Sequence, residues 1–333
     1  MPTAYSTLHY SKQSIYRELQ SKLEIFQSSC EFQGVSFETV DEIYKAIIED
    51  HPEYFWLSGA SSGTTKTCGA FSSVTFRPEL REAAASFNQI RKERTKLEAK
   101  ASELVSLAKR QSYDVYKQIL FLHDYLVQHT DYRSDSQHCY DAYGCLILGR
   151  AVCSGYAAAF QVLMSKLGIE CGRVRGNSAS ALTGEVSHVW NYIRLSDGYY
   201  FVDVTWVDPV VSNGTNRDNL SHEYFCLSSN EIRLTHRFSP NQFIPSAAGT
   251  RYDYYRYHGL YTERYSYDAV KAIAQKQLTR GNKFSVKFGS QTQLDTALHD
   301  LMDNQRIYSI PGVPSRISYG KSKSGLVLEV YCK

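Results

Sequence analysis

The stretch Gly149-Arg-Ala-Val-Cys153-Ser-Gly-Tyr-Ala-Ala-Ala-Phe160 decides the fold of this chain. Apolar side chains continue at helical spacing as far as Leu167, so the pattern predicts a helix that begins at Cys153. Gly168 is a suitable residue to end that helix. The alanines at 157–159 leave little side-chain bulk, and we therefore expect this helix to pack closely on a sheet.

A cysteine in the first turn of a helix lies where free backbone N–H groups and the helix dipole favour an anion. The thiolate, which is the reactive form, is therefore favoured at Cys153. A buried and inert cysteine is the alternative for any single thiol. Here His188 and Asp203 follow later in the chain. They supply the residue types needed for a base and for the group that orients that base.

His188 is expected to open a strand in which Trp190 and Tyr192 share its face. Asp203 lies in an apolar and aromatic strand, where an unpaired carboxylate would be costly. A histidine ring N–H is its obvious partner. The other nine histidines lack such a setting, and Asp208, which precedes a proline, fits a turn better.

The register of these two strands presents a difficulty. A two-residue hairpin at Asp197-Gly198 would place Asp203 opposite Tyr192, and His188 would lie about 13 Å further along the strand. We therefore expect a longer loop, a bulge or a strong twist between the strands. A regular two-residue hairpin would remove Asp203 from the site.

At these residues the chain resembles the transglutaminase-like superfamily, whose core carries Cys, His and Asp in this order. The resemblance covers about residues 113–227, and the segment Asp50–Leu57 resembles one that precedes the core in many bacterial members. It implies a bacterial protein with a papain-like α+β core, in which the helix with Cys153 packs on an antiparallel sheet. It also implies that Cys153 is the nucleophile, His188 the base and Asp203 the orienter. The motifs that carry it are Gly149–Ala157, Leu167–Cys171, His188–Asn191 and Val202–Trp206.

Other parts of the site are less specified by the sequence. The backbone N–H of Cys153 and the side chain of Tyr143 are candidate donors to an oxyanion. Three aromatic residues, Tyr156, Trp190 and Trp206, are candidates for the wall of the substrate cleft, with ordinary core packing as an equal alternative.

We expect no metal and no cofactor. The eight cysteines are scattered through a chain with enough apolar residues to build a core, which favours reduced thiols over disulfides. His138-Cys139 together with Cys145 and Cys153 has gaps unlike those of zinc sites. The core also lacks the clustered acidic residues of a calcium site.

Three regions are expected: a mainly helical N-terminal region over 1–110, the catalytic core over 111–242, and a C-terminal α/β accessory region over 243–333. The patterns predict helices over 11–29, 38–50, 79–110, 113–130 and 267–278, strands over 71–76, 169–174, 283–288 and 325–331, and a loop from 176 to 184.

The chain has 333 residues and a net charge of +3, which is too small to predict a nucleic-acid or membrane partner. The N-terminal residues lack the basic and apolar regions of an export signal. As written, the sequence therefore predicts a cytoplasmic protein, with secretion or cell-surface display as the alternative for a trimmed chain. The oligomeric state is not indicated.

Together these observations predict a thiol acyltransferase that acts on glutamine or other amide groups of a protein or peptide substrate. A cysteine protease or amidase using the same residues is the alternative, because the outcome depends on the acceptor cleft and on water access. A third possibility is a binding module that keeps the fold without activity, against which the presence of all three residue types argues.

Overall fold

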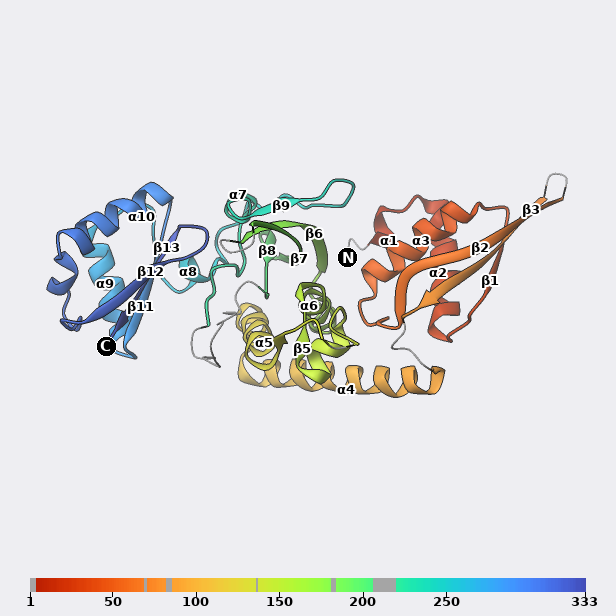
Figure 1. Ribbon diagram of the computed structural model, residues 1–333, viewed down its shortest axis with the longest axis horizontal. Helices are drawn as coiled ribbons and strands as arrows, with labels where there is room; N and C mark the ends of the chain where they lie inside the picture. Colours follow the sequence, from red (N-terminus) through yellow and green to blue (C-terminus); the bar gives the residue numbers. More distant parts are fainter. Residues whose placement is uncertain (1–3, 69–70, 82–85, 136, 181–183, 206–219) are drawn as a thin grey trace.

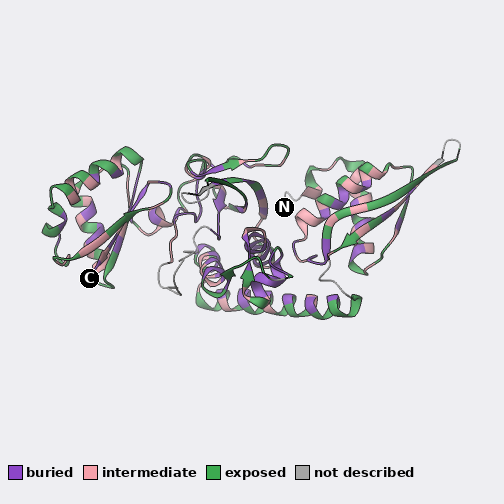
Figure 2. Ribbon diagram, in the orientation of Figure 1, coloured by how far each residue is buried: buried purple, intermediate pink, exposed green. Residues whose placement is uncertain are grey.

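The computed structural model describes residues 4–68, 71–81, 86–135, 137–180, 184–205 and 220–333. Its elements form three groups along the longest axis of the molecule, with the N-terminal group at one end and the C-terminal group at the other (Figure 1). Buried residues lie on the inward faces of the elements in all three groups (Figure 2). The middle group contains the helix predicted at Cys153.

The N-terminal group is an antiparallel sheet of order β1-β3-β2 with helices beside it. Only one strand was predicted here, because the β2 sequence is rich in Gly, Ser and Thr and shows no apolar alternation. It pairs antiparallel with β3 all the same, as far as Cys68 with Phe71. The elements are α1 (Ala4–Thr7), α2 (Tyr10–Glu24), β1 (Cys30–Gln33), α3 (Phe37–Asp50), β2 (Leu57–Cys68) and β3 (Phe71–Leu80).

Long helices connect this group to the middle of the molecule. The helix predicted over 79–110 begins only at Phe87, because Ser86 caps it by accepting the Gln89 N–H, and residues 79–80 complete β3. This helix, α4 (Phe87–Gln111), runs along the middle group (Figure 1). It packs against α5 (Val115–His129) and α6 (Cys153–Leu167).

The middle group has the papain-like α+β arrangement that was predicted. Helix α6 packs against an antiparallel sheet of order β8-β7-β6-β9. Its small residues allow close packing, and Tyr156 through Met164 are all buried. The remaining elements are β4 (Asp131–Tyr132), the π-helical turn η1 (Gly144–Leu148), β5 (Arg150–Ala151), β6 (Cys171–Ser180), β7 (Gly184–Leu195), β8 (Gly198–Val202), α7 (Ser229–Ile232) and β9 (His236–Phe238).

Strands β6 and β7 pair antiparallel over much of the segment where a loop was predicted. They pair continuously from Cys171 with Ile193 to Ser180 with Gly184. The prediction of a loop over 176–184 was therefore wrong, apart from residues 181–183, which lie outside the described residues. His188 lies within β7 instead of opening it.

The C-terminal group has a hydrophobic cluster of its own, whereas the N-terminal and middle groups share one. The predicted helix Tyr267–Leu278 and strand Lys283–Phe288 are confirmed as α9 and β11. The strand order is β10-β11-β13-β12. The other elements are α8 (Tyr254–Tyr257), β10 (Tyr261–Thr262), α10 (Gln291–Leu298), the π-helical turn η2 (His299–Asp303), the 3-10 helix η3 (Arg306–Ser309), β12 (Ile317–Lys321) and β13 (Val327–Cys332).

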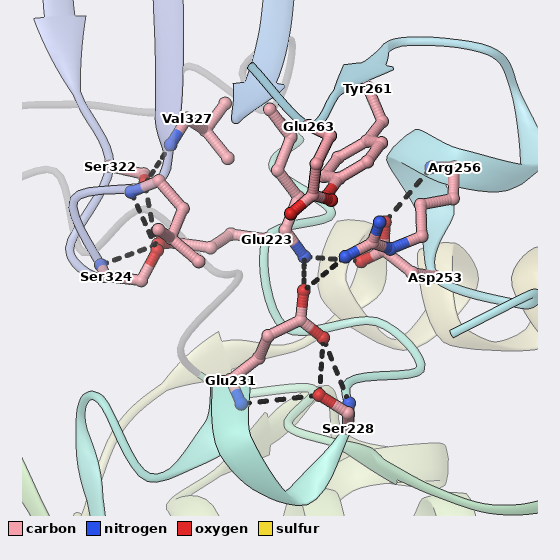
Figure 3. A network of polar contacts seen from close by, with 12 residues as sticks. Glu223, Ser228, Glu231, Asp253, Arg256, Tyr261, Glu263, Ser322, Ser324 and Val327 are labelled. Atoms are coloured by element: carbon pink, nitrogen blue, oxygen red, sulfur yellow. Dashed lines mark hydrogen bonds and ion pairs between the residues drawn. The ribbon is translucent and has the colours of Figure 1, made fainter. Parts of the chain in front are cut away.

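Buried charges join the C-terminal group to the middle of the molecule. The Nζ of Lys287 on β11 lies 2.6 Å from Asp253 and 2.9 Å from Glu231, and Glu231 also completes the capping box of α7 (Figure 3). Nearby, Glu223 accepts the backbone N–H of Ser324 at 2.7 Å (Figure 3). Removing one partner of a buried pair leaves an uncompensated charge, so these contacts hold the two groups together.

All eight cysteines lie within the described residues and are free thiols. None of the helices in the described part of the chain is long and apolar enough to span a bilayer.

Candidate active site

Cys153 is the first residue of α6, and its side chain is partly accessible to solvent. The preceding residue, Val152, makes no side-chain cap, and its carbonyl accepts the N–H groups of Gly155 and Tyr156. The turn packs tightly against the chain before it: a Cβ at Gly155 would lie 2.6 Å from the carbonyl oxygen of Cys139. Glycine is therefore required at position 155, two residues after Cys153, and the small residues around Cys153 reflect this close approach.

His188 lies between Cys153 and Asp203. Its Nε2 is 2.6 Å from Asp203 Oδ2, and it also hydrogen-bonds the side chain of Cys153. Burial alone would lower the pKa of His188, but the charge and hydrogen bond of Asp203, with those of Cys153, outweigh it and raise the pKa to about 9. At neutral pH His188 is therefore an imidazolium between two acidic groups.

The hairpin that carries His188 and Asp203 is regular, contrary to expectation. β7 and β8 pair from Asn191 with Val202 to Leu195 with Gly198, which leaves Ser196 and Asp197 as a two-residue loop. No bulge separates these paired residues. The expected irregularity was wrong, and so was the inference that a regular hairpin would remove Asp203.

The physical reason is a shift of the turn by one residue, which moves the register by two. Continued past Val202, the observed pairing puts Asp203 beside Trp190. His188 is then a diagonal neighbour on the same face, within reach of a long side chain. Asp203 also leaves β8 at this point, because its N–H donates to the carbonyl of Tyr224 at 3.0 Å.

Asp203 is fully buried and its carboxylate is well supplied with donors. Oδ1 accepts the N–H of Thr205 at 2.9 Å, and Oδ2 accepts from His188 and from Nε2 of His236 at 2.9 Å. Burial would raise the pKa of Asp203, but the charge of His188 and the hydrogen bonds of both imidazoles lower it overall. The carboxylate is therefore ionised at neutral pH.

His236 was missed by the sequence analysis, which found no comparable setting for any other histidine. It is fully buried on β9, and its Nδ1 lies 2.9 Å from Thr235 Oγ1. The three-residue strand β9 has no apolar pattern of its own, and only its pairing with Ser178 of β6 places His236 at the site. We call His188, Asp203 and His236 the β7 trio.

Tyr132, whose side chain lies beside the backbone of Cys153, was also missed by the sequence analysis. β4 pairs in parallel with β5 and places Tyr132 beside Ala151. The backbone N–H of Cys153 donates a hydrogen bond to the Tyr132 hydroxyl. Burial, then the charges of Cys153 and Asp203, raise the pKa of Tyr132, so its phenol keeps its proton at neutral pH.

Tyr143, the predicted oxyanion donor, packs elsewhere. It is buried at the start of η1. Its ring centroid lies 5.5 Å from that of Phe55 and 4.9 Å from that of His138. The structure thus places Tyr143 in an aromatic cluster with a residue of the N-terminal group, while Tyr132 occupies the position beside Cys153.

Two of the predicted cleft residues belong to the core. Trp190 is buried and stacks on His188, with ring centroids 6.0 Å apart. Tyr156 is fully buried and its hydroxyl donates to the carbonyl of Thr130 at 2.7 Å. Trp206 lies outside the described residues. Trp190 therefore packs against His188 of the β7 trio, and Tyr156 links α6 to the backbone at Thr130.

Two clusters among the described residues bring metal-ligand atoms together. One is the β7 trio, whose imidazolium has no lone pair to offer on the nitrogen that faces Asp203. The other consists of His123, Asp124 and His222, which we call the α5 trio.

The arrangement combines the parts of a thiol enzyme. A half-exposed thiol lies at a helix N-terminus, an imidazolium contacts it, a buried carboxylate fixes the imidazolium, and a protonated phenol sits at the adjacent N–H. Such a set can hold a thiolate, deliver a proton and stabilise a developing oxyanion.

Comparisons with known proteins assign a family to the middle of the chain. Residues 101–204 match the model of the Transglutaminase-like superfamily. This part of the chain is therefore a core of the transglutaminase-like superfamily.

The matching relatives are much longer proteins. The chain is 22% identical over 191 residues to kyphoscoliosis peptidase of Mus musculus, covering 54% of this chain and 27% of the relative. It is 28% identical over 98 residues to kyphoscoliosis peptidase of Homo sapiens, covering 27% and 15%. A solved structure described as a TGase matches with a TM-score of 0.30 and 11% identity over 46% of each chain. The chain thus spans about a quarter of the mouse relative.

Proposed function

We propose that this chain is a thiol enzyme that breaks amide bonds of a protein or peptide by acyl transfer through Cys153. The observation that carries the proposal is the position of His188, bonded to Cys153 on one side and to Asp203 on the other. In this proposal Cys153 is the nucleophile, His188 the acid and base, and Asp203 the residue that orients His188 and stabilises its charged form.

The first step forms an acyl-enzyme. The thiolate of Cys153 attacks the amide carbonyl. The tetrahedral oxyanion replaces the Tyr132 oxygen as the acceptor of the Cys153 N–H, and it accepts a second hydrogen bond from the Tyr132 O–H. His188 then gives its proton to the leaving amine as the C–N bond breaks. The thioester and a neutral His188 remain.

The second step returns the enzyme to its starting state. Neutral His188 takes a proton from the incoming nucleophile, which attacks the thioester and releases Cys153. The first candidate nucleophile is a primary amine, which makes the protein an acyltransferase toward glutamine side chains. The second is water, which makes it a peptidase or amidase. The name of the curated relatives, kyphoscoliosis peptidase, favours this second outcome.

Mass spectrometry of a glutamine-containing protein, incubated with the enzyme and a primary amine, tests the proposal. Transfer predicts an amine adduct, and hydrolysis predicts cleaved or deamidated products, each absent with Cys153→Ala. Products that persist in Cys153→Ala would contradict the assignment. If wild-type protein yields no product and its Cys153 also reacts with iodoacetamide no faster than free cysteine, the binding-module reading replaces it.

A further inference from the structure

A second cluster of histidine and aspartate lies outside the candidate active site. His123 and Asp124 are neighbours on α5, and His222 comes from a segment about a hundred positions further along the chain. One carboxylate oxygen, Asp124 Oδ1, lies 2.8 Å from His123 Nδ1 and 2.9 Å from His222 Nε2. All three donor atoms lie within 4.8 Å of one another.

We propose that the α5 trio binds one divalent transition-metal ion of the zinc class. Two imidazole nitrogens and one carboxylate oxygen are the ligands that such ions take in proteins. Bonds of about 2.1 Å in a tetrahedral site place ligand atoms about 3.4 Å apart. The two distances from Asp124 Oδ1 to the histidine nitrogens, 2.8 and 2.9 Å, would therefore need to lengthen by only about half an ångström.

The surroundings leave room for a fourth ligand. His222 lines a cavity of about 240 Å³ between the middle and C-terminal groups, and the side chain of Asp124 is 25% exposed. Water can therefore reach the cluster and complete a tetrahedral shell. Solvent access also gives the ion a path of entry.

His123 provides an independent reason to assign a ligand. Its side chain is fully buried, and its Nε2 has no hydrogen-bond partner among the described residues. A buried polar atom without a partner destabilises the fold, and an apolar side chain at this position would avoid that cost. A metal bond at Nδ1 would offset it, with the ring proton carried on Nε2.

The ion would connect α5 to the segment that supports the candidate active site. His222 is two residues from Tyr224, whose carbonyl accepts the N–H of Asp203 at 3.0 Å. In this position the ion has a structural role, holding the backbone that positions Asp203 without touching the reacting atoms.

Titration of the metal-free 333-residue Cys153→Ala protein with Co²⁺ tests this proposal, because that background removes the partly accessible thiol of the candidate active site. A tetrahedral site gives intense visible absorption bands, and the proposal predicts that they saturate at one ion per chain and disappear when Zn²⁺ is added. His222→Gln and Asp124→Asn should each weaken binding at least about tenfold. His129→Gln, an exposed histidine near the end of the same helix, is the matched control and should bind as the parent does.

Circular dichroism of each metal-free variant checks that it is folded. Asp124→Asn keeps a hydrogen-bond acceptor and serves where His222→Gln is unfolded. Absence of stoichiometric visible bands in the parent would show a hydrogen-bonded trio without a metal. Bands unchanged in both trio variants would show adventitious binding elsewhere. Either result would overturn the proposal, and neither bears on the acyl-transfer assignment.

Discussion

The β7 trio and the α5 trio are each built from two histidines and one aspartate in nearly the same geometry. In each, a single carboxylate oxygen lies within hydrogen-bond distance of a nitrogen from two imidazoles, at 2.6 and 2.9 Å in the β7 trio and at 2.8 and 2.9 Å in the α5 trio. In each, burial would raise the pKa of the aspartate and the two histidines lower it overall. Composition and spacing alone do not distinguish them.

The charged residues around each trio do distinguish the two. Burial is the largest influence on the pKa of His188 and of His222, and it favours the neutral ring in both. At His188 the two acidic groups Asp203 and Cys153 reverse that effect and raise the pKa to about 9. At His222, Asp124 raises the pKa, but His123 and Lys283 oppose it and the pKa stays lowered. The comparison teaches that the surrounding charges decide the state of such a cluster: acidic partners on both sides favour the imidazolium at His188, whereas nearby His123 and Lys283 favour the neutral ring at His222.

The largest expected effect comes from replacing His188 of the β7 trio, and His222 of the α5 trio provides the comparison. His188→Gln should lower kcat/KM of the Cys153-dependent reaction by about 10³-fold or more, because it removes the acid and base. His222→Gln should lower it by at most about tenfold, since it acts only through the backbone that holds Asp203. Equal losses in the two variants, measured on the same peptide, would break the distinction.

The charge on His188 also predicts a pH-dependent stability. Because its pKa is raised from 6.5 to about 9 in the folded state, the stabilisation is fully present below pH 6.5 and is lost as pH rises through 9. The loss is about 3 kcal/mol between these limits. Urea unfolding at pH 6 and pH 10 should show a larger fall for the wild type than for His188→Gln. Identical falls would mean that His188 carries no such charge.

Tyr132→Phe separates oxyanion stabilisation from the acid–base chemistry of the β7 trio. The variant should lower kcat by about 10²-fold, as loss of one oxyanion donor does elsewhere. The rate of Cys153 alkylation should change little, because no oxyanion forms there. Tyr143→Phe is the matched control, with kcat within about threefold of wild type, since its hydroxyl lies in another cluster. If Tyr143→Phe causes the larger loss, the oxyanion assignment belongs to that residue.

A smaller catalytic effect than that of His188→Gln or Tyr132→Phe is expected at His236, the second histidine of the β7 trio. His236→Gln should lower kcat about tenfold, because Asp203 loses one of its two imidazole donors and is less well positioned. His236→Asn offers a shorter side chain with the same amide chemistry and should be worse. A kcat–pH profile should show whether the alkaline limb moves as well, and an effect as large as that of His188→Gln would make His236 a direct participant.

Local sequence patterns predicted those parts of the molecule that short-range physics decides. The start of α6 at Cys153, α9 and β11 follow from apolar spacing and end signals that lie within the elements themselves. β2 was missed because its exposed Gly, Ser and Thr residues carry no such spacing.

The candidate site was predicted only in part, for a related reason. Cys153, His188 and Asp203 stand in recognisable motifs, whereas His236 and Tyr132 reach the site only through pairing of very short strands, β9 with β6 and β4 with β5. The predicted register of the β7–β8 hairpin was wrong. The sequence Asp197-Gly198 is typical of a turn, but in the structure Gly198 pairs with Leu195. A shift of one turn residue changes every cross-strand partner.

NMR titration of the ring of His188 tests the central claim most directly, because it needs no substrate. With the resonance assigned through His188→Gln, the account predicts an imidazolium that persists from neutral pH to a midpoint near 9, and a lower midpoint in Asp203→Asn. A wild-type midpoint at or below 6.5, unchanged in Asp203→Asn, would contradict a His188 held in its charged form between Cys153 and Asp203.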